Sequence, residues 1–139
     1  MSEDRVRITL NDQGVAEVAM VRADKMNALD QAMFDALAAA IARLKTEPGL
    51  RAVVLHGEGR SFCAGLDKSR FGKIARGADG GVRDLRTRTH GAANSAQVVG
   101  IGWRELPVPV IAAIQGAAFG GGLQVALGAD IRLLAPDAQ

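Results

Sequence analysis

Gly116-Ala-Ala-Phe-Gly-Gly-Gly-Leu-Gln124 is the segment around which the rest of the sequence is organised. Apolar residues 110–114 precede it and small residues 125–129 follow it, which predicts a strand, a glycine turn and a helix. The three consecutive glycines permit a sharp turn and the close approach of another group. The first N–H groups of such a helix lack partners within it and suit an anion or a developing oxyanion. A plain tight turn with close helix packing explains the glycines equally well.

Length and composition favour one globular domain, 1–139, of 48% hydrophobic and 23% charged residues. The net charge of +2 is too small to indicate a nucleic-acid partner. Cys63 is the only cysteine, which excludes an internal disulfide and is compatible with a reducing compartment. The charged N-terminus lacks the apolar core of a signal peptide, and no apolar run is long enough for a membrane span. We therefore expect a cytoplasmic protein.

Periodicity predicts the elements of the first half. Alternating residues 6–10 and 15–21 predict a hairpin around a polar turn. Asp30 is a candidate N-cap for a helix over 30–46, whose apolar residues recur at helical spacing. A short buried strand follows at 52–55.

The second half continues the alternation of helices and strands. Residues 68–82 carry several basic residues and glycines, which predicts a partly helical, mobile loop. Its charges indicate a solvated loop more than a phosphate site. A long helix is predicted over 83–105, with Trp103 in the core, followed by strands 110–114 and 131–135. The alternation indicates an α/β protein.

Several familiar sites are absent from the sequence. There is no Gly-x-Gly-x-x-Gly after the first strand, no Gly-Lys-Ser phosphate loop and no Gly-x-Ser-x-Gly elbow. His56 and His90 lack carboxylates or cysteines at ligand spacing, so we predict no metal site. A nucleotide-phosphate site at the glycine turn has little support.

Two turns of small residues each follow a buried strand. They are Cys63-Ala-Gly-Leu-Asp67 and Gly120-Gly-Gly122. If the two turns converge, each can offer one backbone N–H to a single oxygen, which is the arrangement of an oxyanion hole.

Four segments together resemble successive motifs of the crotonase superfamily, the enoyl-CoA hydratases, isomerases and their relatives. The segments are Arg22-Ala-Asp-Lys-Met-Asn-Ala-Leu29, Ser61-Phe-Cys-Ala-Gly-Leu-Asp67, Pro107-Val-Pro-Val-Ile-Ala-Ala-Ile114 and Gly116-Ala-Ala-Phe-Gly-Gly-Gly-Leu123. Ala-Asp-Ile-Arg132 also fits. The resemblance implies a spiral of ββα units with two sheets meeting at an angle, C-terminally truncated here, and assembly into trimers or hexamers.

The resemblance also implies an acyl-CoA thioester as ligand, with no separate cofactor and no metal. Its carbonyl oxygen would sit between the N–H groups of Leu66 and Gly121, which would stabilise an enolate. The backbone of 64–67 would hold the adenine end of CoA. Lys25, Arg22 and Lys68 are candidate phosphate contacts, for which plain surface charges are the competing account. The implied substrate-binding residues are Arg22, Lys25, Met26, Ala64, Gly65, Asp67, Lys68, Gly120 and Gln124.

The sequence departs from the hydratase pattern at Gln124, where those enzymes carry a glutamate. Because glutamine cannot transfer a proton as a carboxylate does, an isomerase-like reaction is favoured over hydration. The acid of isomerase-type members would fall shortly after Gln139, so we expect no catalytic base within 1–139. The alternative is a truncated, non-catalytic acyl-CoA-binding or assembly module. In either case we expect exposed apolar faces on 125–129 and 131–135.

Overall fold

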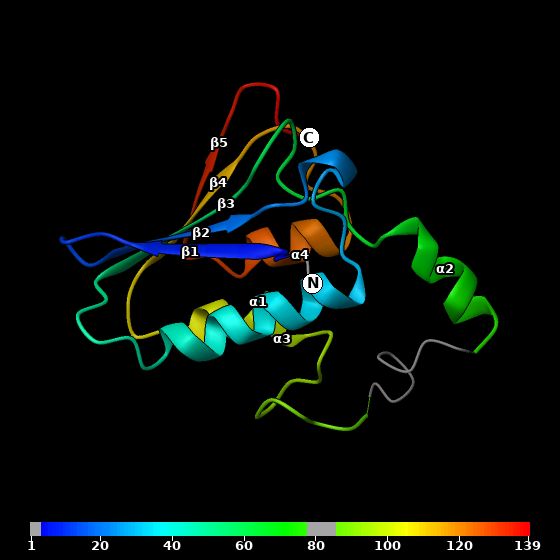
Figure 1. Cartoon of the computed structure of the whole chain (residues 1–139), viewed down its shortest axis with the longest axis horizontal. Helices are drawn as coiled ribbons and strands as arrows, with labels where there is room; N and C mark the ends of the chain where they lie inside the picture. Colours follow the sequence, from blue (N-terminus) through cyan, green and yellow to red (C-terminus); the bar gives the residue numbers. More distant parts are fainter. Residues whose placement is uncertain (1–3, 78–85) are drawn as a thin grey trace.

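A five-stranded sheet forms the centre of the molecule in the computed structural model, which describes residues 4–77 and 86–139. The strands lie side by side in chain order (Figure 1). They are β1 (Val6–Leu10), β2 (Val15–Met20), β3 (Ala52–Gly57), β4 (Val110–Ile114) and β5 (Ile131–Leu134). β1 and β2 form the predicted antiparallel hairpin, and β2 to β5 run parallel to one another. The α/β class is therefore confirmed.

The longest helix among the described residues is α1 (Gln31–Leu44). Its start is fixed by Asp30, whose side chain accepts a 2.8 Å hydrogen bond from the Met33 N–H, as the sequence predicts. The apolar stripe is buried against the sheet: Met33, Leu37, Ala40, Ile41 and Leu44. The stripe and the cap together account for both the position and the orientation of this helix.

The chain winds repeatedly through a strand, a bridging residue and a helix, which matches the expected ββα repeat. After β2 the bridging residue is Leu29, which pairs with Leu66 after β3. Cys63 in that same segment pairs with Ala118 after β4. After β5, Gln139 accepts a 2.9 Å hydrogen bond from the Ala118 N–H. These pairings form a second ladder, called here the bridge ladder, beside the ends of the parallel strands.

The remaining helices are short. They are α2 (Lys68–Ala75), which extends away from the sheet in Figure 1, α3 (Val98–Ile101) and α4 (Gly121–Leu127). Two 3₁₀ turns, η1 (Ala23–Lys25) and η2 (Gly102–Glu105), complete the set among the described residues. The predicted helical part of 68–82 is confirmed, whereas 78–82 lies outside the described residues.

The prediction of one long helix over 83–105 is wrong for the part that the structure describes. Residues 86–97 are irregular, and helical structure begins only at Val98. Gly91, with φ of 64°, sits in a tight turn where His90 and Ala93 pair. Asn94 then accepts hydrogen bonds from the N–H groups that follow it, which ends the loop and starts α3. Local turn chemistry thus overrides the helical spacing of the apolar residues.

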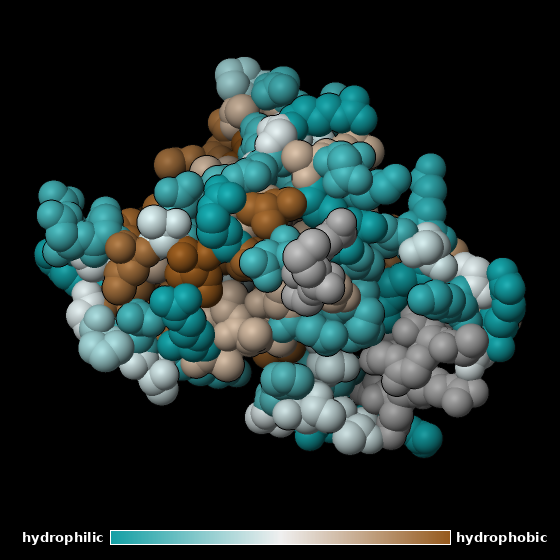
Figure 2. Space-filling model, in the orientation of Figure 1, coloured by the Kyte–Doolittle hydropathy of each residue, from teal (hydrophilic) through white to brown (hydrophobic). Residues whose placement is uncertain are grey.

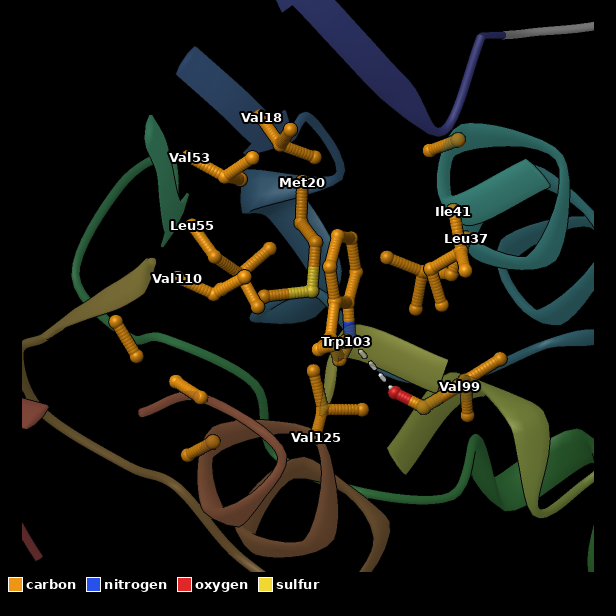
Figure 3. Packing of buried hydrophobic residues seen from close by; sticks show 14 of the residues in the cluster. Val18, Met20, Leu37, Ile41, Val53, Leu55, Val99, Trp103, Val110 and Val125 are labelled. Atoms are coloured by element: carbon orange, nitrogen blue, oxygen red, sulfur yellow. Dashed lines mark hydrogen bonds between the residues drawn. The ribbon is translucent and has the colours of Figure 1, made fainter. Parts of the chain in front are cut away.

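Trp103 lies at the centre of the core, as the sequence predicts. Its indole is fully buried between Met20 of the sheet and Leu37 of α1, with Val125 of α4 on a further side (Figure 3). The indole N–H donates a 2.9 Å hydrogen bond to the Val99 carbonyl. The largest aromatic side chain therefore joins the sheet to three helical segments with its polar atom satisfied.

The far edge of the sheet is apolar and exposed. Figure 2 shows hydrophobic atoms along the edge that β5 occupies in Figure 1. Large apolar side chains between 46% and 64% exposed cluster in the last part of the chain: Ile101, Phe119, Leu123, Leu127, Ile131, Leu133 and Leu134. The expectation of exposed apolar faces is confirmed for β5 and for one side of α4, whereas Val125, Ala126 and Ala129 are buried.

Candidate functional site

The two predicted turns converge through backbone hydrogen bonds. The Cys63 N–H donates to the Ala117 carbonyl at 2.9 Å, and the Phe119 N–H donates to the Cys63 carbonyl at 3.1 Å. The turn after β3 therefore lies directly against the glycine turn after β4. Parallel neighbouring strands end at the same edge of the sheet, which is why segments so far apart in sequence meet here.

Glycine is required where the two turns touch. A Cβ atom added at Gly122 would lie 2.2 Å from the Cys63 carbonyl oxygen. A Cβ atom added at Gly65 would lie 2.6 Å from the Phe119 carbonyl oxygen, and Gly65 also has a φ of +88°. Any side chain at either position would push the turns apart, so the small-residue pattern reflects backbone contact.

Leu66 and Gly121 carry the two N–H groups that the sequence singles out. Neither N–H donates a hydrogen bond within 4–77 and 86–139. Gly121 is the first residue of α4, where an N–H has no partner inside the helix. The Gly121 nitrogen lies 3.6 Å from the Cβ position built on Gly65, the neighbour of Leu66. Two unsatisfied backbone donors thus come from the two turns that touch.

A cavity of about 490 Å³ opens beside the first turn. Seven of the predicted site residues line it: Arg22, Lys25, Met26, Ala64, Leu66, Asp67 and Lys68. Asp24, Ala28 and Ser69 complete the lining. The structure therefore brings the first and second sequence motifs together around one hollow, whose size is that of an ordinary small-molecule site.

Lys25 and Lys68 are exposed at this cavity, and neither forms an ion pair with any described residue. Their ammonium groups are therefore available to an anionic ligand. Arg22 differs from them, because its side chain is only 14% exposed and is bonded to the protein. Its Nη1 donates to the Asp67 carboxylate at 2.6 Å and to the Ala28 carbonyl at 3.0 Å.

Asp67 is held as a carboxylate. Hydrogen bonds from Ser69, followed by the hydrogen bond and positive charge of Arg22, lower the pKa of Asp67 to about 2. For Asp30, burial raises the pKa, but hydrogen bonds from Arg5 and Met33 and the charges of Arg22 and Arg5 together bring it below its usual value. At neutral pH both groups are ionised acceptors, which does not suit them to donate a proton.

Cys63 is unsuited to act as a nucleophile. Burial raises the pKa of its thiol to about 11, so the thiolate is scarce at neutral pH. The thiol donates to the Asn27 carbonyl at 3.1 Å. Cys63 is therefore a buried structural residue of the turn.

Gln124 lies in a second cavity, also of about 490 Å³, between α3 and α4. The lining is mainly small and apolar but includes four polar or charged residues: Ala92, Ala93, Ala96, Gln97, Gly100, Ile101, Arg104, Glu105, Gln124, Leu127 and Gly128. Gln124 does not line the cavity of Lys25 and Lys68, and neither do Gly65, Gly120 or Gly121. The predicted site residues thus divide between two hollows and the pair of turns.

The sequence reasoning missed Asn27 as a part of the site. Its side chain is fully buried, and its amide donates to the Glu58 and Ser61 carbonyls at 3.0 and 2.9 Å. Its side-chain oxygen accepts from the Arg22 N–H at 2.9 Å. A signal was present, because asparagine within a polar loop is among the few residues that tolerate positive φ, here 55°.

No metal-binding cluster of three or more histidine, cysteine, aspartate or glutamate residues occurs in the described part of the chain. No helix among the described residues is long and apolar enough to cross a membrane. The candidate site thus lies at the edge of the sheet where β3 and β4 end, and it offers the N–H groups of Leu66 and Gly121. One cavity beside it is lined by Lys25 and Lys68, and the cavity of Gln124 is lined mainly by small and apolar residues.

Comparisons with known proteins assign this chain and its fold to a family. The sequence model of the family described as enoyl-CoA hydratase/isomerase matches residues 11–139, so the chain belongs to this family. A probable enoyl-CoA hydratase from Bacillus subtilis is 34% identical over 128 residues, covering 92% of this chain and 46% of the relative. The chain spans about half the length of the curated relatives it matches.

Solved structures confirm the crotonase-like fold. An enoyl-CoA hydratase/isomerase from Mycobacterium paratuberculosis superposes with a TM-score of 0.82 at 26% identity, covering 97% of this chain and 51% of that one. A monofunctional enoyl CoA isomerase from M. smegmatis gives a TM-score of 0.73 at 29% identity, covering 97% and 52%. The windings of strand, bridge and helix are therefore those of this fold.

Proposed function

We propose that the chain forms the single thioester-binding domain of an acyl-CoA-processing enzyme. The observation that carries the proposal is the pair of unsatisfied N–H groups of Leu66 and Gly121 on two touching turns. A thioester carbonyl oxygen placed between them would accept two hydrogen bonds. These bonds would strengthen as negative charge develops on the oxygen, which stabilises an enolate-like transition state more than the bound substrate.

The two cavities divide the ligand in this proposal. Lys25 and Lys68 would contact the CoA phosphates, and the backbone of 64–67 would hold the adenine end. The apolar cavity of Gln124 would take the acyl group, because its walls are mainly alanine, glycine and leucine. Coenzyme A enters only as part of the substrate, with no separate cofactor or metal.

Within the family we favour proton transfer between carbons, as in an isomerase, over addition of water. Gln124 lacks the carboxylate that activates water, and an amide neither releases nor takes up a proton near neutral pH. Asp67 in the first cavity is ion-paired, and Glu105 in the second is paired with Lys45. We assign the proton-transferring group to no described residue.

The same observations favour a second candidate, an acyl-CoA-binding module without catalysis. Such a module needs the N–H pair and the lysines but no base. It also fits the exposed apolar surface of α4 and β5, which would join it to other polypeptide. Turnover by the chain alone would contradict this alternative.

A matched pair of ligands tests the proposal. Calorimetry would compare a short acyl-CoA thioester with the thioether analogue that lacks only the carbonyl oxygen. We expect the thioester to bind about tenfold more tightly, because two backbone hydrogen bonds of ordinary strength are lost with that oxygen. Gly121→Pro removes one donor and should reduce the preference. Equal affinity of the wild-type chain for both ligands would overturn the proposal, and an isomerase assay then separates the two candidates.

Assembly and location extend the proposal. A homotrimer or hexamer is supported by the family membership and by the apolar residues exposed on α4 and β5. A cytoplasmic location is supported by the single cysteine, Cys63, which is free and buried. Sedimentation of the purified protein would test the assembly.

A further inference from the structure

We propose that Arg22 is a positioning residue for the Leu66 N–H and acts through Asp67, instead of contacting a CoA phosphate. The inference rests on the proposed function for its consequence in binding, although its structural part can be tested without any ligand. It starts from the one basic residue of the first cavity that is bonded into the protein.

Arg22 joins the backbone segment that contains Leu66 to the segment that pairs with it. Its Nη1 donates to the Ala28 carbonyl at 3.0 Å and to the Asp67 carboxylate at 2.6 Å. Ala28 precedes Leu29, which pairs with Leu66, and Asp67 directly follows Leu66. One guanidinium therefore ties together both sides of the bridge that holds Leu66.

The bridge itself leaves the Leu66 N–H free. Leu29 donates its N–H to the Gly65 carbonyl at 2.8 Å, and the Asp67 N–H donates to the Leu29 carbonyl at 3.1 Å. The residues before and after Leu66 are thus fixed, while Leu66 itself makes no backbone bond through nitrogen within the described residues. The Leu66 N–H shares a planar peptide group with the Gly65 carbonyl. Its direction is therefore set by how the segment of Leu29 is held against the segment of Leu66, and these are the two segments that Arg22 joins.

Charge argues against a phosphate at Arg22. Its Nη1 lies 2.6 Å from Asp67 and 3.4 Å from Asp30, so two carboxylates face this cation. A phosphate brought to the same group would be repelled by both carboxylates. The side chains of Arg22 and Asp67 are 14% and 12% exposed, and an ion pair so little exposed is weakened only slightly by salt. Lys25 and Lys68 remain the phosphate contacts.

Three variants isolate the role of the pair. Asp67→Asn keeps an oxygen that accepts from the Ser69 N–H but removes the charge that faces Arg22. Arg22→Met removes the cation and its hydrogen bonds. Arg43→Met is the matched control, because it breaks, by the same chemical change, the ion pair between Arg43 of α1 and Glu47 just after α1.

The first measurement uses the ligand-free chain. In amide nitrogen–proton NMR spectra we expect Asp67→Asn and Arg22→Met to shift or broaden the Leu66 signal, and Arg43→Met to leave it in place. The remaining signals report whether each variant is folded, and Asp67→Asn is the milder change. A Leu66 signal unchanged in both variants would overturn the positioning role, whatever the ligand.

The second measurement is the ratio of thioether to thioester dissociation constants. We expect a wild-type ratio of about ten to fall to about two in both variants, with the affinity for free CoA unchanged within about twofold. If Arg22→Met weakened thioester, thioether and free CoA equally and kept the ratio, Arg22 would be a phosphate contact and the inference would fail. A wild-type ratio of one would instead overturn the proposed function, while the NMR result still decides whether Arg22 positions Leu66.

Discussion

At the scale of single residues, Asn27 shows how one buried side chain can connect several backbone segments around the candidate site. Its amide and carbonyl oxygen satisfy three backbone groups, from Arg22, Glu58 and Ser61. The main-chain carbonyl of Asn27 accepts a hydrogen bond from the Cys63 thiol. The loop before α1, the turn after β3 and the cavity wall therefore share one hydrogen-bonded centre.

Asn27→Ala should lower the free energy of unfolding by about 3 kcal/mol, because buried carbonyls lose their donors and alanine tolerates positive φ poorly. Asn11→Ala is the matched control, since Asn11 also bonds backbone N–H groups but lies in an exposed turn. We expect it to cost about 1 kcal/mol or less. Urea unfolding followed by circular dichroism measures both, and equal losses would contradict the central role of Asn27.

Asp67 makes the stability depend on pH in a defined window. Its pKa is lowered from 3.8 to about 2 in the folded chain, so the unfolded state binds more protons between these values. The stabilisation is present above about pH 4 and is lost as the pH falls towards 2. Asp67→Asn should flatten this part of the profile, measured as unfolding free energy against pH. An unchanged acid limb would show that Asp67 is not responsible.

At the scale of elements, the contact between two turns decides whether the site exists. The turns are separated by more than fifty residues, yet the parallel pairing of β3 and β4 places their ends together. Gly122 packs against Cys63 with no room for a side chain. The helix α4 begins one residue before this contact, which fixes where its free N–H groups lie.

Gly122→Ala should separate the turns, costing about 2–3 kcal/mol and reducing the preference for thioester over thioether. Gly72→Ala, within α2, is the control. A Cβ added there has room, since the nearest atom is the end of the Arg76 side chain at 3.5 Å. It should be neutral or stabilise by about 0.5–1 kcal/mol, since alanine favours helices over glycine. Thermal unfolding and calorimetry measure the two effects, and an unaltered preference in Gly122→Ala would argue against the converged turns as the binding element.

Sequence periodicity was sufficient to predict the elements in which buried and exposed residues alternate regularly. The hairpin, α1 with its Asp30 cap, and strands β3 to β5 follow from alternation, helical spacing and turn residues. The predicted helix over 83–105 is wrong for 86–97, because Gly91 and Asn94 impose turns that the spacing of apolar residues does not reveal. The hydrogen bond between Arg22 and Asp67 could not be predicted from the sequence either, because the two residues are 45 positions apart and come together only in the folded chain.

At the scale of the whole molecule, the edge formed by α4 and β5 exposes several large apolar side chains that no described residue covers. All four residues of β5 are exposed, and the strand has a neighbour on one side only among the described residues. An edge strand with exposed apolar side chains invites pairing with another chain. The 139-residue chain by itself should therefore associate.

Replacing Leu133 and Leu134 by Lys should reduce this association by about tenfold or more, because two half-exposed leucines contribute roughly 1 kcal/mol each on burial. Phe71→Lys on α2 is the control, since Phe71 is 58% exposed but lies away from β5. Sedimentation velocity over a range of concentrations measures the association. A chain that stays monomeric without the substitutions would contradict the expectation.

The bridge ladder also governs the order in which the molecule can be completed during synthesis. Each winding rests on the one before it: Leu66 on Leu29, Ala118 on Cys63, and Gln139 on Ala118. A growing chain can settle its first windings as they leave the ribosome, since domains generally fold from the N-terminus. The turn of Leu66 and the turn of Gly121 can nevertheless come into contact only once Gly122 has emerged, so this contact forms after the first windings.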